Sequence, residues 1–267
     1  MESSSQTPPR LLAEERRREI LRVLDENGRV TVEEVVRRFG VSAVTARGDL
    51  DALSERGALV RSHGGGIRPL TGTGIPEHPL RAREAIHAEE KRRIAHVAVQ
   101  LIRPSQTVIL CTGSTSAALA NEIRQNCPTN LTVITYALNI ASILADVPNL
   151  SMVMLGGMLR HPSGAFVGPQ AEHMIDSLHA DHCFLSTVGM DLEVGLTTLD
   201  IMEAPLNRRM IASAAQVTVI ADSSKFGHRS LSAIGGFRSV RRLITDTGAP
   251  SGTVENLRAQ GIEVCLA

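Results

Sequence analysis

The sequence is poor in aromatic residues. It has no Trp, a single Tyr and five Phe, so aromatics make up 2% of its 267 residues. Hydrophobic residues nevertheless make up 43% of the chain, which is enough for a packed core. That core must be built mainly from Leu, Ile, Val and Ala. The length allows one large domain or two of ordinary size.

Cysteines are also few, and they follow no metal-binding pattern. The four are Cys111, Cys127, Cys183 and Cys265. No two stand at C-x-x-C spacing, and none has a His at the spacing of metal ligands. We interpret them as reduced thiols in a cytoplasmic protein, and we expect neither a metal nor another cofactor.

The sequence also has no excess of positive or negative charge. The chain has 28 basic and 28 acidic residues, and residues 1–68 contain 12 Arg against 11 Asp and Glu. One subunit is therefore expected to have only modest non-specific electrostatic affinity for nucleic acid. Oligomerisation would compensate for this.

The chain has no apolar run of the ~18 residues that a membrane span needs. Residues 1–10 are polar and contain no apolar signal core. We expect a disordered tail over residues 1–12, a cytoplasmic location and no membrane partner.

Three further segments differ in composition. Residues 13–68 carry short amphipathic, charged patterns, whereas 69–84 are rich in Gly and Pro, as linkers are. Residues 85–267 alternate short apolar runs with helical patterns, which indicates β-α-β units and a Rossmann-like, mostly parallel sheet. The predicted strands are Thr107–Cys111, Leu131–Thr135, Ser151–Leu155, Cys183–Thr187, Val217–Ala221, Arg242–Thr245 and Glu263–Leu266.

The segment 13–68 predicts a helix-turn-helix. After a first helix over about Glu14–Asp25, Thr31 and Glu34 form a capping-box pattern at the start of a second helix. Gly40 ends that helix, and Ser42 caps a third. The start of such a third helix enters the major groove of DNA.

A wing follows the third helix. Ala58–Arg61 and Gly65–Ile67 can pair as a hairpin, which makes the fold a winged helix-turn-helix. On the exposed face of the third helix, we expect Arg47 to contact a guanine or a phosphate. The candidate DNA-binding residues are Ser42, Thr45, Arg47, Arg61 and His63.

In the second domain, Gly113-Ser114-Thr115-Ser116 follows an apolar strand and opens a helix. Free backbone N–H groups, hydroxyls and a helix N-terminus favour an anion such as phosphate. The same four residues could also be a tight turn with a helix cap.

These motifs resemble a known family. The segments "VTVEEVVRRFGVSAVTARGDLDALSERG" and "LVRSHGGGI", within Arg18–Ile67, are similar to the winged helix of DeoR-type repressors. The segments "KRRIA", "TYALNIA", "LGGMLR", "GAFVGPQAE", "GLTT" and "DSSKFG", between Glu90 and Thr245, resemble the sensor domain of that family. That sensor fold resembles ribose-5-phosphate isomerase and glucosamine-6-phosphate deaminase, which implies a sugar-phosphate effector.

The resemblance implies roles for individual residues. Gly113, Ser114, Thr115 and Ser116 would hold the phosphate, and Lys225 would add a charge to it. Asp191 and Glu203 are candidates for sugar hydroxyls, while Asn139 and Arg160 would line the pocket mouth or a subunit contact.

The sequence departs from the family pattern at several positions. Gly48 stands where a second Arg is usual. Cys111, Tyr136 and Val188 replace an acid, an Asn, and an Asp or Asn, which suggests an altered or weakened ligand. Pro205 interrupts a helical pattern, so that helix should kink or begin there.

We therefore predict a repressor that binds double-stranded operator DNA as a homodimer or homotetramer and responds to a sugar phosphate. One alternative is a constitutive DNA-binding regulator with a vestigial pocket. The other is a sugar-phosphate isomerase. Isomerisation needs a carboxylate base and an electrophile, but "GLTT" contains no Lys, so we expect no enzymatic activity.

Overall fold

The chain divides into two compact units, Met1–Ala82 and Arg83–Ala267. The computed structural model describes residues 11–27, 29–56, 58–62, 64–67 and 80–267. Residues 1–10 of the predicted tail, His63 of the predicted wing and residues 69–79 of the predicted linker lie outside this part. The end of the predicted linker is helical, in α4 (Leu80–Ala85).

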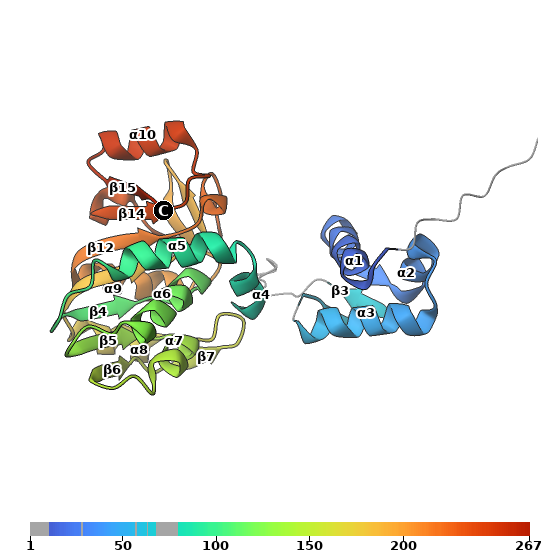
Figure 1. Ribbon diagram of the computed structural model, residues 1–267, viewed down its shortest axis with the longest axis horizontal. Helices are drawn as coiled ribbons and strands as arrows, with labels where there is room; N and C mark the ends of the chain where they lie inside the picture. Colours follow the sequence, from blue (N-terminus) through green and yellow to red (C-terminus); the bar gives the residue numbers. More distant parts are fainter. Residues whose placement is uncertain (1–10, 28, 57, 63, 68–79) are drawn as a thin grey trace, which may run out of the picture. The chain divides into compact units, whose positions relative to one another are not determined.

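The described residues of the amino-terminal unit form helices around one core and a small antiparallel sheet (Figure 1). Ile20, Val35 and Leu50 bring one side chain from each helix into that core. The elements are α1 (Ala13–Asn27), β1 (Arg29–Thr31), α2 (Val32–Phe39), α3 (Ala43–Glu55), β2 (Val60–Ser62) and β3 (Gly65–Ile67).

The predicted helix-turn-helix is confirmed. Both bonds of the capping box are present, because Glu34 N–H donates to Thr31 Oγ1 at 3.1 Å and Thr31 N–H to Glu34 Oε2 at 2.7 Å. Gly40 ends α2 in the left-handed region, with φ of 63°. Ser42 caps α3 by accepting the N–H of Thr45 at 3.1 Å.

The wing contains one strand more than predicted. β3 pairs with β2 as expected, and β1 pairs with the other side of β3. A Cβ at Gly65 would lie 2.1 Å from the carbonyl oxygen of Val30. Glycine is therefore required for β1 to approach.

The carboxyl-terminal unit is built on a seven-stranded sheet with the order β15-β14-β12-β9-β4-β5-β6. All neighbouring strands of this sheet are parallel, as predicted. The strands are β4 (Thr107–Leu110), β5 (Leu131–Thr135), β6 (Leu150–Met154), β9 (Ala180–Leu185), β12 (Ala214–Ile220), β14 (Arg242–Thr245) and β15 (Glu263–Leu266).

Helices cover both faces of this sheet (Figure 1). Successive residues of a strand point to opposite faces, so Leu110 packs in one apolar cluster and Ile109 in the other. The cluster of Leu110 includes side chains of α5 (Ala88–Val99), α6 (Ser114–Gln125) and α7 (Leu138–Leu144). The cluster of Ile109 includes α8 (Pro169–Asp176), α9 (Glu203–Ala212) and α10 (Ser251–Ala259).

Two short antiparallel sheets were not predicted. β7 (Met158–Arg160) pairs with β8 (Ala165–Val167). β11 (Gly195–Thr198) pairs with both β10 (Gly189–Asp191) and β13 (Ser232–Gly235). Strands this short leave little alternation to detect in a sequence.

Pro205 lies in the first turn of α9, which begins at Glu203. Proline is tolerated there because the N–H groups of a first turn have no partner within the helix. The prediction that a helix begins near Pro205 is confirmed. No helix among the described residues has the length and apolar character of a membrane span.

Candidate functional site

The recognition helix α3 presents a sharply divided surface. Ala46, Asp49 and Leu50 are buried, whereas Val44 and Arg47 are exposed. Arg47 makes no hydrogen bond or ion pair with any described residue, so its guanidinium is available for an external partner. This is what the predicted contact to a base or a phosphate requires.

Ser42 and Thr45 are exposed, as predicted, but their side chains already have partners. Ser42 Oγ caps α3, and it lies 2.9 Å from Thr45 Oγ1. A contact between either hydroxyl and DNA would therefore share a capping group. Their role in binding DNA stays a prediction.

Arg61 connects the wing to the recognition helix. Its Nε lies 2.8 Å from Asp51 Oδ1 on α3, and its Nη1 donates to the carbonyl oxygen of Gly65 at 2.6 Å. The side chain is 32% exposed, so it can still meet a phosphate. His63 lies outside the described residues.

Asp49, which fixes the recognition helix against α1, was not among the predicted site residues. The buried carboxylate of Asp49 accepts hydrogen bonds from Arg16 Nε at 2.6 Å and from Arg17 Nε at 2.9 Å. Both arginines belong to α1. The family motif contains this Asp, but its partners lie more than thirty positions away, so no local pattern revealed them.

The predicted phosphate loop lies where β4 meets α6. Gly113 is the N-cap residue, with φ of 145°, and a Cβ there would lie 2.7 Å from the Cβ of Ser186. Ser116 is buried, and its Oγ lies 2.8 Å from Ser186 Oγ. The backbone N–H groups at the start of α6 have no intrahelical partners, so they can donate to an anion.

Lys225 lies in the short 3₁₀ helix η1 (Ser223–Lys225), directly after β12. Its Nζ is 4.0 Å from Oδ2 of Asp222, which is buried. The loop at Gly113 and this helix both follow strands of the parallel sheet, with β9 between those strands. At ~4.8 Å per strand, the two features lie about 10 Å apart along the sheet edge.

Lys91 is the second basic residue near this edge, and sequence analysis did not select it. It is 3% exposed, and its Nζ donates to the carbonyl oxygens of Arg83, at 2.6 Å, and of Ile86. Burial lowers its pKa below the ordinary value of lysine, while the nearby Asp222 carboxylate opposes and the Lys225 ammonium reinforces that shift. Lys91 is therefore within electrostatic range of both Asp222 and Lys225.

The scarcity of lysine in the sequence could have identified Lys91 as a candidate. Lys91 and Lys225 are the only lysines among the 28 basic residues of the chain. All other basic positions are arginine. Lysine offers a compact charge with three donors, which suits a phosphate.

Several buried polar atoms at this edge have no hydrogen-bond partner. They are Asn139 Nδ2 and Oδ1, Ser163 Oγ and Asp222 Oδ2. Ser163 is joined to the phosphate loop, since its carbonyl oxygen accepts the hydroxyl of Thr112 at 3.2 Å. Unpaired buried polar atoms are costly, and a polar ligand would satisfy them.

Glu203 belongs to a network between α9 and the β7–β8 hairpin. Its Oε2 accepts the Thr198 hydroxyl at 3.1 Å, and its Oε1 lies 3.5 Å from Arg160 Nη1. Arg160 Nε also donates to Asp200 Oδ2 at 2.5 Å. The predicted pocket residues Glu203 and Arg160 are thus brought together.

Asp191 occupies a different position, at the end of β10, where the chain turns into β11. Its Oδ1 accepts the N–H groups of Glu193 and Val194. Arg229 Nε lies 3.0 Å from Oδ2, and that contact is the main cause of the lowered pKa of Asp191. Both oxygens are therefore engaged, one by its own turn and the other by Arg229. The contact of Asp191 with a sugar stays a prediction.

The unusual residues Cys111 and Tyr136 are fully buried. Tyr136 donates its hydroxyl to Asn207 Oδ1 at 2.9 Å, and Cys111 Sγ lies 3.9 Å from Cys183 Sγ. Burial raises the pKa of the Tyr136 hydroxyl well above its ordinary range. Among the described residues, no group of three or more His, Cys, Asp and Glu side chains could hold a metal.

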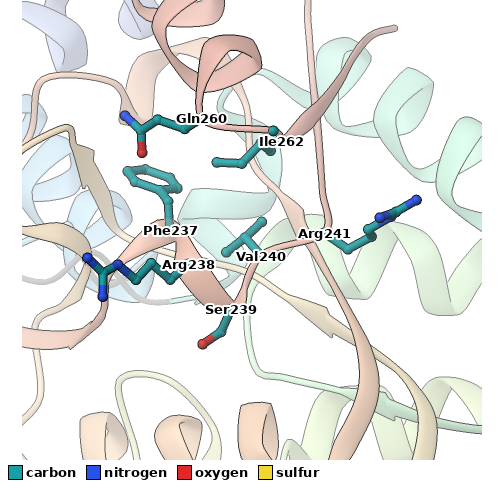
Figure 2. Close-up of a pocket in the computed structure, with 8 residues that line it drawn as sticks. Phe237, Arg238, Ser239, Val240, Arg241, Gln260 and Ile262 are labelled. Carbon is teal, nitrogen blue, oxygen red and sulfur yellow. The ribbon is translucent and has the colours of Figure 1, made fainter.

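A pocket of about 310 Å³ lies elsewhere, near Phe237 and Ile262 (Figure 2). Its lining includes the residues that precede β14 and β15, so it lies at the amino-terminal edge of the sheet. Arg238 and Arg241 point away from each other in Figure 2. They do not converge on an anion, and this pocket is distinct from the phosphate loop.

Comparisons with known proteins identify both units. Residues 16–69 match the family model described as the DeoR-like helix-turn-helix domain, and residues 86–247 match the DeoR C-terminal sensor domain. A ribose 5-phosphate isomerase A from Methanocaldococcus jannaschii is 18% identical, with a TM-score of 0.39 over 52% of this chain and 55% of that chain.

Curated relatives match over nearly their whole length. A putative aga operon transcriptional repressor of Escherichia coli O157:H7 is 37% identical over 94% of this chain and 93% of its own. The glycerol-3-phosphate regulon repressor of Escherichia coli K12 is 30% identical over 92% of this chain and 96% of its own. The chain therefore belongs to the DeoR family of transcriptional regulators.

Proposed function

We propose that this protein is a repressor that releases operator DNA when a phosphorylated sugar binds its carboxyl-terminal unit. The observation that carries the effector assignment is the Lys225 ammonium beside the buried Asp222, with the only other lysine, Lys91, in electrostatic range of both. This group stands at the carboxyl-terminal edge of the parallel sheet, where ligands of α/β folds collect.

Each part of the site has a separate task in this proposal. The N–H groups at the start of α6 and the hydroxyls of Ser114 and Thr115 donate hydrogen bonds to phosphate oxygens. Lys225 and Lys91 supply charge. Glu203 and Asn139 bind sugar hydroxyls. The names of the relatives, which include a glycerol-3-phosphate regulon repressor, favour the same ligand class.

Lys91 suggests how the effector acts on the DNA-binding unit. Its ammonium holds two carbonyl groups of the α4–α5 turn, those of Arg83 and Ile86. A phosphate that binds Lys91 competes for those donors and changes this turn, which follows the connection between the units. Release then requires that the effector bind the DNA-incompetent arrangement more tightly, by several kcal/mol in total.

The proposal includes a homodimer or homotetramer. Residues 1–68 are nearly neutral and one winged helix contacts few base pairs, so pairing on a repeated site must supply affinity. Light scattering at micromolar concentration should give twice or four times the 28.7 kDa of one chain. A monomer in the presence of operator DNA would contradict this part.

We propose no catalysis. An isomerase needs a carboxylate within reach of the substrate carbon, but Asp191 has one oxygen engaged by its own turn and the other by Arg229. Incubation with pentose and hexose phosphates should give no isomer in a discontinuous assay.

The effector assignment is tested by calorimetry with a panel of pentose and hexose phosphates beside their unphosphorylated counterparts. Phosphorylated compounds should bind at least tenfold more tightly, and the same compounds should release DNA in a gel-shift titration. Binding without release would contradict the switch. If no phosphate ester binds below millimolar concentration, the alternative of a constitutive regulator with a vestigial pocket is favoured.

A further inference from the structure

The exposure of the apolar side chain of Val44 has no explanation in the packing of the fold. It is the second residue of α3 and is 77% exposed, the largest fraction among the exposed large apolar side chains of the described residues. The apolar residues Ala46, Leu50 and Leu53 of the same helix are buried. A β-branched residue also gives a helix no advantage over Ala. Stability therefore does not account for Val44.

Two exposed residues beside Val44 have little or no side chain. Gly48 lies one turn further along, on the same face of the helix, and a Cβ built there meets nothing within 4 Å. Ala43 precedes Val44 and is also exposed. The hydroxyls of Ser42 and Thr45 are engaged with each other. We call Ala43, Val44 and Gly48 the apolar step of the recognition helix.

Arg47 borders this step and is three residues from Val44. Three helical residues rise ~4.5 Å, which is close to the ~3.4 Å between successive bases of one strand. The two side chains can therefore reach neighbouring base pairs in the major groove. An arginine suits guanine O6 and N7 there, whereas an apolar side chain suits the 5-methyl group of thymine.

We propose that Val44 contacts the 5-methyl group of a thymine in each operator half-site, within one or two steps of the base contacted by Arg47. This inference rests on the proposed binding of operator DNA, and it assigns a sequence preference to a residue that carries no hydrogen-bonding group. Val44 cannot bind phosphate, so its contribution is to specificity.

The test uses deoxyuridine, which differs from thymidine only by this methyl group. Duplexes are first selected from random-sequence DNA with the full-length chain, and each thymine of the selected site is then replaced in turn. At one position per half-site, deoxyuridine should weaken binding of the wild type roughly fourfold, the value of one buried methyl group. Val44→Ala should bind the thymine and deoxyuridine duplexes equally, and Val44→Ile should retain the preference.

Leu12→Ala is the matched control. Leu12 is 72% exposed in the same unit, next to α1. Glu14 of that helix pairs with Arg56, at the opposite end of α3 from Val44. This variant should keep the full preference for thymine. Val44→Ala should fold normally, since Ala is the better helix former.

Two results would overturn the inference while specific binding persists. One is a wild type that is indifferent to deoxyuridine at each thymine, and the other is a Val44→Ala variant with undiminished methyl sensitivity. A wild type that selects no sequence at all would instead refute the proposed operator binding.

Discussion

Asp49 on the recognition helix and Arg16 on α1 form a buried ion pair, with 2.6 Å between Oδ2 and Nε. Arg16 is 8% exposed and Asp49 is 2% exposed. Removing one partner of such a pair leaves a buried charge and costs about 3–5 kcal/mol. We therefore expect Asp49→Asn to lower the free energy of unfolding of the amino-terminal unit by this order, as measured by urea denaturation followed by circular dichroism.

The exposed pair of Arg22 and Glu19 provides the control for this prediction. Its two atoms are 3.1 Å apart, with side chains 54% and 41% exposed. Exposed pairs contribute about 0–1 kcal/mol. Glu19→Gln should therefore change the unfolding midpoint little. Equal effects of the two variants would show that Asp49 does not fix α3 against α1.

Substitution of Gly48 is expected to raise the free energy of unfolding, in contrast to Asp49→Asn. It is exposed within α3, and a Cβ there would meet open space. Glycine in a helix costs about 1 kcal/mol relative to alanine. Gly48→Ala should raise the free energy of unfolding by about that amount, measured by thermal melting. A destabilised variant would mean that the backbone at Gly48 is under a constraint that the helix alone does not explain.

Much of the fold could be predicted because its signals are local or periodic. The Thr31–Glu34 capping box and Gly40 fix the ends of α2 within a few residues. β5, β14 and β15 have the predicted bounds because each is a short apolar run between turns. The pairing of β1 with β3 was missed, since it depends on contact between segments more than thirty residues apart.

The site was less predictable for a related reason. The Gly113 loop follows from its own sequence, since a strand, a glycine and small hydroxyl residues stand together. Lys91 precedes that loop by more than twenty residues. The charges of Asp222 and Lys225 influence its pKa, and only folding brings these residues within range of one another. The resemblance implied that Asp191 contacts the ligand, but its carboxylate is engaged by its own turn and by the distant Arg229.

His182 should make stability depend on pH. It is buried in β9, where its ring stacks on Phe184 and its Nε2 lies 2.7 Å from Thr218 Oγ1. Burial, reinforced by the nearby charge of Arg242, lowers its pKa from 6.5 to about 4. The unfolded chain therefore takes up a proton at this His at a higher pH than the folded chain.

The stability that neutral His182 contributes is present above pH 6.5 and is lost as the pH falls towards 4. The full loss is about 3 kcal/mol in order of magnitude, at 1.36 kcal/mol per unit. His182→Gln should flatten the dependence of the unfolding free energy on pH between 6.5 and 4. An unchanged slope would assign acid sensitivity to other groups.

The final prediction concerns the two lysines, Lys91 and Lys225. Lys225→Met and Lys91→Met should each weaken binding of a phosphorylated sugar at neutral pH by about 1.5–3 kcal/mol, as loss of a charge-assisted hydrogen bond does. Neither should alter the affinity for the unphosphorylated sugar. Calorimetry with both forms separates loss of the phosphate contact from general damage to the pocket.

The dependence of this binding on pH distinguishes Lys91 from Lys225. Because burial lowers the pKa of Lys91, its ammonium loses its proton below the pH of 10.5 at which free lysine does so. Phosphate affinity of the wild type should therefore fall as the pH rises towards 10.5. Lys225→Met should retain the part of this fall that Lys91 causes, whereas Lys91→Met should lose that part. If both variants keep the same pH profile as the wild type, Lys91 does not bind the phosphate and serves only to hold the α4–α5 turn.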